Sequence, residues 1–275
     1  MALPSPDPAD TVAVTGASSG IGAAIALELA ARGHGLTLVA RGEERLRELA
    51  GRIEAEHGVL VDVVACDLVD DAERLELVAA LRAPGARRLV GLCNDAGVGS
   101  VGSVVELDAD HEVRIVRLNA LALHELTVRL IGGFVEQGSG AILNVASVNG
   151  FQPLPGTATY SATKAFVISF SEALHAELAG TGVSCTVLSP GPTRTAIWER
   201  SGAPDIEGAG PGFLWQEASD VARVAVDAMV EGRRTAVPGL TNKLAALGGW
   251  YASRSVLLPV VRALGSGRLV DRSRD

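Results

Sequence analysis

Tyr160 and Lys164 have the residue types and the spacing for acid–base chemistry. They are four positions apart, so a helix through both would bring their side chains onto one face. A free phenol has a pKa of about 10, and a neighbouring ammonium group favours the phenolate and lowers that value. The pair is therefore a candidate proton donor and acceptor for interconverting a carbonyl group and an alcohol.

A glycine-rich turn at residues 16–22, with the sequence GASSGIG, could bind a phosphate group. Gly16 permits a tight turn, Gly20 lets the backbone approach a phosphate, and Gly22 allows the following helix to pack closely on a sheet. The N-terminus of that helix offers free N–H groups and the positive end of its dipole. The turn therefore predicts a site for the pyrophosphate of a dinucleotide.

The same turn also matches the pattern G-x-S-x-G, in which Ser18 would be the nucleophile of a serine hydrolase. A nucleophile elbow follows several strands of its sheet, whereas only one short predicted strand, residues 11–14, precedes this turn. None of the five histidines stands in a setting that marks it as the base. We therefore reject the hydrolase interpretation.

The residue that follows the second predicted strand indicates which dinucleotide would bind. A dinucleotide fold usually has an acidic residue about 20 positions after its glycines, where it binds the adenosine ribose. Here the sequence has Ala40 followed by Arg41. An arginine would pair with a 2′-phosphate, which a carboxylate would repel. Arg41 therefore favours NADP(H) over NAD(H); the alternative is that it only ends the strand and faces water.

These residues need a fold that brings the ends of several strands together. Predicted strands alternate with predicted helices through the first part of the chain, which is typical of a parallel sheet wound with helices on both faces. We expect an α/β, doubly wound (Rossmann-type) parallel sheet in a single domain with a C-terminal helical extension. The expected organisation is a flexible leader at 1–10, a catalytic domain at 11–240 and an extension at 241–275. Strands are predicted at 11–14, 36–40, 59–65, 89–93, 140–145, 183–188 and 235–237, and helices up to 32 and at 43–57, 71–81, 110–137, 157–179 and 219–231.

Composition limits the classes of function. The chain has 275 residues and a net charge of −8, which argues against nucleic-acid binding. Its three cysteines are far apart without a CxxC spacing, so we expect neither a disulfide framework nor a metal site. This use of cysteine predicts a reducing compartment, the cytoplasm. The first ten residues lack the features of a signal peptide, and no apolar run is long enough to predict a membrane span.

The chain resembles the short-chain dehydrogenase/reductase family, because the family's motifs occur in their usual order over residues 11–195. The family usually has two asparagines before Ala-Gly, whereas this chain has Asp95 as the second residue. In the family that second residue helps to brace the central sheet, so we expect a local change in hydrogen bonding rather than lost activity. The resemblance depends on TGASSGIG at 15–22, Asp67, NDAG at 94–97, Asn119, Ser147, Tyr160 with Lys164, and PGPTRT at 190–195.

The resemblance implies a role for each matched residue and implies no metal. Tyr160 would exchange a proton with the substrate oxygen, and Ser147 would position that oxygen. Lys164 would lower the pKa of Tyr160 and hold the nicotinamide ribose, and Asn119 would hold a water that links Lys164 to solvent. The catalytic residues would be Asn119, Ser147, Tyr160 and Lys164. The cofactor-binding residues would be Gly16, Ser18, Ser19, Gly20, Ile21, Gly22, Arg41, Asp67, Asn94, Tyr160, Lys164, Pro190, Thr193 and Thr195, with Asp67 and Asn94 beside the adenine and its ribose.

The sequence therefore predicts an NADPH-dependent oxidoreductase that interconverts a ketone or aldehyde and an alcohol. A non-catalytic NADPH-binding redox sensor is the alternative. The resemblance also implies a homodimer or homotetramer formed through the helices at 110–137 and 157–179. We expect a mobile flap at 196–216. An apolar small-molecule substrate is indicated by Phe151, Leu154, Ile197, Trp198, Phe213 and Trp215.

The C-terminal part of the chain differs from the rest in charge. From Arg233 onward it has eight basic and two acidic residues, with apolar clusters between residues 236 and 264. We expect this segment to pack on the domain or on a partner subunit. The alternative is that a basic, apolar surface makes peripheral contact with a membrane.

Overall fold

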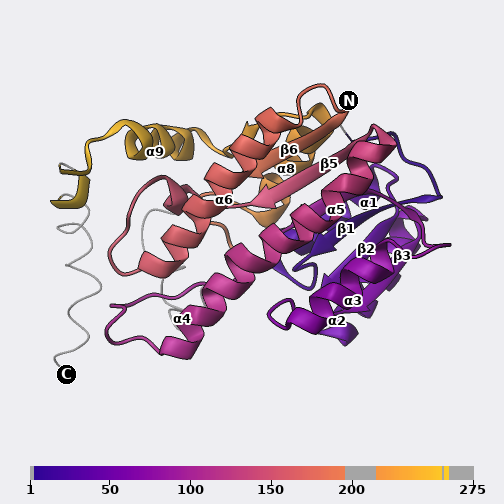
Figure 1. The fold of residues 1–275 in the computed structure, drawn as a ribbon, viewed down its shortest axis with the longest axis horizontal. Coiled ribbons are helices and arrows are strands. Elements are labelled where there is room, and N and C mark those ends of the chain that lie inside the picture. The colour runs from indigo at the N-terminus through magenta and orange to yellow at the C-terminus, as the bar shows by residue number, and fades with distance from the viewer. Residues whose placement is uncertain (1–2, 196–214, 256, 260–275) are drawn as a thin grey trace.

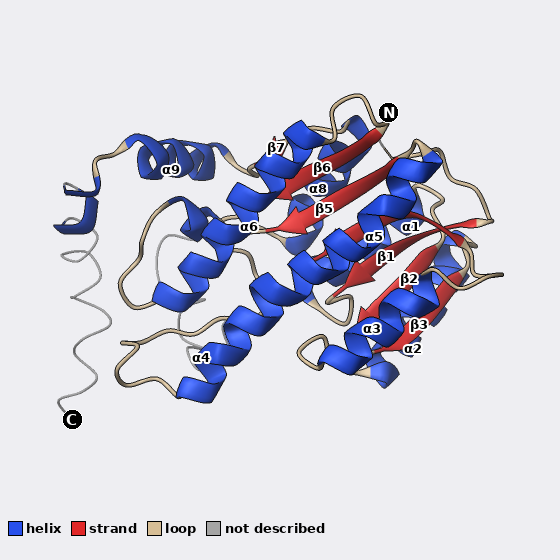
Figure 2. Ribbon diagram, viewed as in Figure 1, coloured by secondary structure: helices blue, strands red, loops and turns tan. Residues whose placement is uncertain are grey.

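A single sheet of seven parallel strands forms the centre of the computed structural model, which describes residues 3–195, 215–255 and 257–259. The strand order is β3-β2-β1-β4-β5-β6-β7, and helices cover both faces (Figures 1 and 2). This arrangement confirms the predicted doubly wound parallel sheet. The strands are β1 (Asp10–Thr15), β2 (Leu36–Ala40), β3 (Val61–Ala65), β4 (Arg88–Asn94), β5 (Gly140–Val145), β6 (Val183–Leu188) and β7 (Thr235–Ala236).

Two apolar clusters, one on each face, hold the helices to the sheet. Successive strand residues alternate between them, so Val12 and Val14 belong to one cluster and Ala13 to the other. The central strands are buried on both faces and are therefore almost continuously apolar. One face packs against α1 (Gly20–Ala31), α2 (Glu43–His57) and α8 (Ala218–Glu231), and the other against α3 (Asp71–Leu81), α5 (Leu123–Gln137) and α6 (Ala158–Glu177).

The long helix predicted at 110–137 is present but is interrupted by a π-helical segment. It consists of α4 (Ala109–Val116), the π segment η1 (Arg117–Ala122) and α5. Such segments insert an extra residue into a turn and are frequent at functional sites. Among the described helices, only Ala109–Gln137 is long and apolar enough by length and composition to cross a membrane. Part of this apolar character belongs to Leu126, Leu130 and Phe134, whose side chains are buried in the core.

The N-terminal segment differs from the expected flexible leader. Leu3 is only 1% exposed and belongs to the core cluster that contains Val12. Asp10 begins β1, and its carboxylate accepts a hydrogen bond from Arg88 Nε at 2.7 Å. Leu3 and Asp10 therefore fix the two ends of the described leader to the domain, although residues 5–9 between them are exposed.

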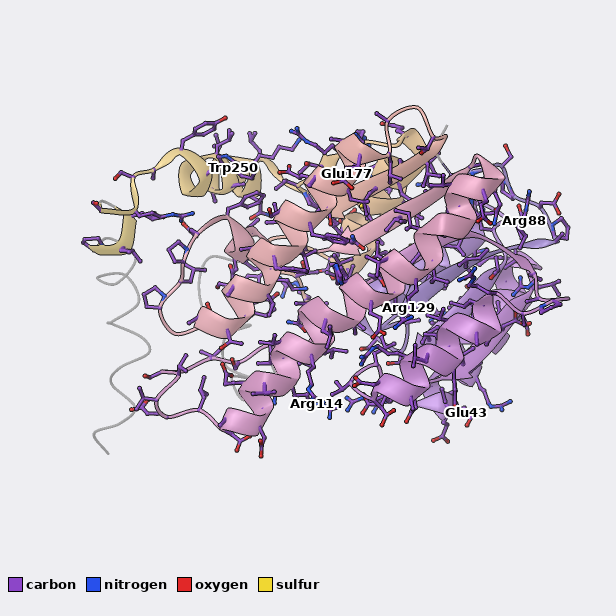
Figure 3. The ribbon with its side chains drawn as sticks, in the orientation of Figure 1. Glu43, Arg88, Arg114, Arg129, Glu177 and Trp250 are labelled. Carbon is purple, nitrogen blue, oxygen red and sulfur yellow. The ribbon has the colours of Figure 1, made fainter. Side chains whose placement is uncertain are left out.

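The C-terminal extension begins with α9 (Leu240–Tyr251), which lies at one side of the molecule (Figure 1). Asn242, Ala246 and Gly249 are buried against the domain. Trp250, labelled in Figure 3, packs its ring 5.6 Å from the ring of Phe151. The opposite face of α9 is exposed and carries Leu240, Leu244, Leu247 and Tyr251.

Candidate active site

A cavity of about 780 Å³ lies where the parallel strands end. Strands β1 and β4 are neighbours at the centre of the sheet, and the chain runs outward from them in opposite directions. In doubly wound sheets, ligands bind at this switch point, outside the carboxyl ends of the strands. Most of the predicted site residues line the cavity: Gly16, Ser18, Ser19, Gly20, Ile21, Arg41, Asp67, Ser147, Tyr160, Lys164, Pro190, Thr193 and Thr195.

Tyr160, Ser147 and Lys164 meet at one wall of the cavity. Tyr160 lies in the first turn of α6 and Lys164 one turn later, as their spacing predicted. The Tyr160 hydroxyl is hydrogen-bonded to Ser147, which follows β5. The Ser147 Oγ also accepts a hydrogen bond from the backbone N–H of Asn149 at 3.2 Å. The start of α6 and the segment after β5 therefore bring the three side chains together.

The pKa of Tyr160 differs from the sequence-based expectation. Burial raises the pKa of Tyr160 to about 12, although its bond to Ser147 opposes the rise. Lys164 Nζ donates to the carbonyl oxygen of Val145 at 2.8 Å and lies 5.7 Å from the centre of the Tyr160 ring. Burial also lowers the pKa of Lys164 to about 8. Burial and the charge of Asp95 therefore outweigh the hydrogen bond from Ser147, and the phenol is protonated at neutral pH.

Asn119 lies in the π segment and is not among the residues that line the cavity. Its Oδ1 accepts from the N–H of Val98 at 3.0 Å, and its Nδ2 donates to the Val98 carbonyl at 2.8 Å and to Thr163 Oγ1 at 3.3 Å. A Cβ on Gly97 would lie 3.3 Å from Asn119 Oδ1 and 3.6 Å from Lys164 Nζ. Asn119 thus fixes the loop after β4 close to Lys164, and its role in a proton relay remains a prediction.

The glycine turn packs against two other segments of the cavity wall. Gly16 and Gly20 have φ values of +71° and +61°, which residues other than glycine rarely adopt. A Cβ on Gly16 would lie 2.8 Å from the backbone nitrogen of Ala96, and one on Gly20 would lie 3.3 Å from Thr195 Cγ2. The turn and Thr195 therefore border the same space at the N-terminus of α1, where an anion would be favoured.

Asn94 and Asp95 have exchanged the positions expected of them. Asn94 was expected beside the adenine, but its Nδ2 donates to Asn144 Oδ1 at 2.9 Å and to Thr127 Oγ1 at 3.1 Å inside the protein. It is 3% exposed and does not line the cavity, so it braces β4 against β5 and α5. Asp95, left out of the predicted site, lines the cavity instead.

Asp95 reaches the glycine turn, and Gly22 makes room for it. The Asp95 carboxyl accepts a hydrogen bond from the backbone N–H of Gly22. A Cβ on Gly22 would lie 2.6 Å from Asp95 Oδ2 and 2.6 Å from the carbonyl oxygen of Gly16. Gly22 itself does not line the cavity. The only signal in the sequence was the replacement of the family's second asparagine by an acid.

The opposite end of the cavity carries both signs of charge. Arg41 is exposed at the end of β2, and Arg45, which the sequence analysis missed, also lines the cavity together with Glu43 and Glu44. Asp67 Oδ2 accepts from Arg114 at 2.8 Å. Although burial opposes the change, this bond lowers the pKa of Asp67. Arg114 and Glu43 lie toward the same edge of the molecule in Figure 3.

The residues expected to shape an apolar substrate pocket are only partly in place. Trp215 lines the cavity, whereas Phe151 packs against α9 and Leu154 is not among the lining residues. Ile197, Trp198, Phe213 and most of the expected flap at 196–216 lie outside the described residues. Thr193 connects the two described sides of this region, because it forms a parallel β-bridge with Gln216.

Comparison with known proteins agrees with this architecture. The family model for short chain dehydrogenases matches residues 10–205. Sulfoacetaldehyde reductase from Chromohalobacter salexigens is 40% identical over 192 residues, which cover 68% of this chain and 73% of that enzyme. The very-long-chain 3-oxoacyl-CoA reductase of Anas platyrhynchos is 34% identical over 183 residues, which cover 64% of this chain but only 57% of that enzyme.

A solved structure extends the similarity to almost the whole chain. A short-chain dehydrogenase from Sphingobium yanoikuyae in complex with NADPH is 36% identical, with a TM-score of 0.79, and the match covers 91% of this chain and 95% of that one. The chain belongs to the short-chain dehydrogenase/reductase family of NAD(P)-dependent oxidoreductases.

Proposed function

We propose that this protein uses NADPH to reduce a ketone or aldehyde to an alcohol, and catalyses the reverse oxidation. The observation that carries the proposal is the hydrogen bond between Tyr160 and Ser147, with Lys164 one turn away, in a cavity that also contains the glycine turn. A redox sensor that only binds the cofactor would not need these three side chains together. Their arrangement therefore favours an enzyme over the sensor.

The residues around the cavity fit a dinucleotide. The N-terminus of α1 and Thr195 suit the pyrophosphate, and Pro190 and Thr193 border the space beyond it. Asp67 suits the adenosine half. The bound cofactor would supply or accept the hydride, and the protein would contribute binding, orientation and proton transfer.

Proton transfer belongs to Tyr160 in this proposal. The substrate oxygen would accept hydrogen bonds from Tyr160 and Ser147, so that Tyr160 can give its proton to that oxygen during reduction. In the oxidation direction Tyr160 would take the proton of the alcohol. Because burial raises the pKa of Tyr160 to about 12, the acid needed for reduction is in place at neutral pH. Lys164 would hold the nicotinamide ribose, and Asn119 would hold a water that returns protons.

A preference for NADP(H) rests on Arg41 with support from Arg45. Two guanidinium groups beside the cavity can neutralise a 2′-phosphate. Glu43 and Glu44 oppose this effect, but Glu43 is paired with Arg47. The bound NADPH named for the Sphingobium relative supports the same preference.

An apolar substrate is proposed from Trp215 and from Leu118 and Val148, which also line the cavity. The named substrates of the relatives differ widely in chemistry, since one is a long acyl thioester and the other a small sulfonated aldehyde. Similarity alone therefore selects no substrate. A panel of carbonyl compounds graded in length and polarity, followed by NADPH absorbance, tests the proposal. Oxidation of NADPH with at least one apolar ketone or aldehyde supports it, and a response to polar compounds only would contradict the apolar assignment.

We also propose a homodimer or homotetramer formed through the helices Ala109–Gln137 and α6. Val116, Val128 and Val135 on the first helix and Phe166 on the second are exposed. Burying such a surface between copies would remove apolar area from water. Light scattering after gel filtration measures the mass, and a monomer at micromolar concentration would contradict the assignment.

The exposed face of α9 is proposed to pack against a partner subunit, with peripheral membrane contact as the second possibility. Sedimentation with anionic vesicles separates the two, using Leu244→Glu as the variant that should lose a membrane contact.

The thiols of Cys66, Cys93 and Cys185 are free and buried, in keeping with the cytoplasmic location that we propose.

A further inference from the structure

The carboxyl group of Asp95 is enclosed at the N-terminus of α1. It accepts the backbone N–H of Gly22, which lies in the first turn of that helix. Its Oδ2 is so close that a Cβ on Gly22 would lie only 2.6 Å away. The backbone of Asp95 is fixed as well, since its N–H donates to Thr15 Oγ1 at 3.1 Å. The side chain is thus built into the glycine turn rather than free to swing away.

This position matters because the same helix end is the proposed site of the pyrophosphate. The first N–H groups and the positive dipole end of a helix stabilise a nearby anion. An ionised Asp95 would already be stabilised by this helix end, and its charge would repel a second anion close by. A neutral asparagine at this position would not.

Several titratable groups face Asp95 and must be considered with it. Lys164 and Tyr160 act on it from α6, and Cys93 lies on β4 two residues earlier. Burial raises the pKa of Asp95 to about 7, although the charge of Lys164 and the Gly22 hydrogen bond oppose the rise. Asp95 can therefore change its charge near neutral pH.

We propose that Asp95 competes with the pyrophosphate of the cofactor for the N-terminus of α1, so that binding of the dinucleotide draws a proton onto Asp95. A buffer acid loses the proton, which forms an O–H bond on the carboxylate, and no covalent bond of the cofactor changes. This inference rests on the proposed binding of NADPH in the cavity. It makes Asp95 a positioning residue that links cofactor affinity to pH.

The expected sign follows from the charge. As the pH rises through about 7, Asp95 becomes an anion and NADPH affinity falls. Loss of the Lys164 proton at higher pH would also weaken binding, so the two causes must be separated. In Asp95→Asn the repulsion is absent, but Lys164 loses an acidic neighbour and its pKa falls further.

Calorimetric titration with NADPH, from about pH 6 to about pH 8.5 in pairs of buffers that differ in ionisation enthalpy, measures both affinity and proton uptake. For the wild-type protein we expect uptake of a fraction of a proton and a clear fall in affinity with pH. For Asp95→Asn we expect smaller uptake and binding about threefold to tenfold tighter than wild type at the highest pH. The matched control is Asp110→Asn, which neutralises an exposed acid in the first turn of α4.

The comparison of variants cancels protons bound by the 2′-phosphate, because NADPH is the same in each titration. Equal uptake in wild type and Asp95→Asn, or weaker binding of Asp95→Asn at high pH, would overturn the inference and assign the pH effect to Lys164. No binding of NADPH at any pH would overturn the proposed function and this inference with it. If Asp95→Asn folds poorly, Asp95→Ser is titrated in its place, because it also removes the carboxylate and is expected to show the same smaller uptake.

Discussion

The two walls of the cavity are built in different ways. The wall at the ends of β1 to β3 presents backbone N–H groups at the glycine turn, together with the exposed side chain of Arg41. The wall at the end of β5 and the start of α6 presents Ser147, Tyr160 and Lys164, each less than 10% exposed and each hydrogen-bonded to another part of the protein. Under the proposed function, one wall would bind the cofactor through many small contributions, and the other would depend on single side chains that are held rigidly.

This difference predicts where single substitutions matter. On the catalytic wall, replacing one functional group removes an interaction that no neighbour can supply. On the nucleotide wall, losing one side chain leaves the backbone site intact, and serious damage comes only from adding atoms where glycine is required. The following predictions are ordered by expected effect.

Lys164→Met should give the largest effect. Methionine keeps most of the buried volume but removes the ammonium group, so kcat should fall at least about a hundredfold. The chain contains only one other lysine, Lys243, which is exposed on α9. Lys243→Met is therefore the matched control and should keep wild-type turnover in a steady-state assay. Turnover by Lys164→Met within about threefold of wild type would contradict the proposal that catalysis depends on this single buried side chain.

Gly22→Ala should be next, with an effect on stability as well as on NADPH binding. The added methyl group would meet Asp95 Oδ2 and the Gly16 carbonyl, so the free energy of unfolding should fall by roughly 1–3 kcal/mol. Gly51→Ala on α2 is the control, because a Cβ there meets nothing within 4 Å and should raise stability slightly. Urea unfolding of both variants measures the difference, and equal stability would show that the close packing at Gly22 is not restrictive.

Arg41→Ala should give the smallest effect and should be selective. Loss of one guanidinium contact to a 2′-phosphate should raise KM for NADPH about tenfold and leave KM for NADH nearly unchanged. Arg52→Ala is the control, because Arg52 is exposed on α2, pairs with Glu56 and does not line the cavity. An equal change in KM for both cofactors would mean that Arg41 does not contact the 2′-phosphate.

The fold could be predicted from the sequence because its signals are local. Apolar strands, capped helices and the glycine turn each depend on neighbouring residues, and the predicted order of strands and helices agrees with the structure. Leu3 was not foreseen in the core, because a single apolar residue in a proline-rich segment gives no periodic pattern.

The electrostatics of the site could not be predicted in the same way. The spacing of Tyr160 and Lys164 indicated their common face, but the pKa of the phenol depends on burial by residues far along the chain. The exchange between Asn94 and Asp95 was also hidden, because adjacent strand-end residues point in opposite directions and the sequence does not say which one faces the cavity.

The most direct test of the central claim uses the only two tyrosines of the chain, Tyr160 and Tyr251. Both are changed to phenylalanine, singly, and each variant is assayed for NADPH-dependent carbonyl reduction and for NADPH binding by fluorescence titration. We predict that Tyr160→Phe loses at least about a hundredfold in kcat while binding NADPH within about twofold of wild type, and that Tyr251→Phe, on the exposed face of α9, changes neither. Near-wild-type turnover by Tyr160→Phe would contradict the assignment of this phenol as the proton donor.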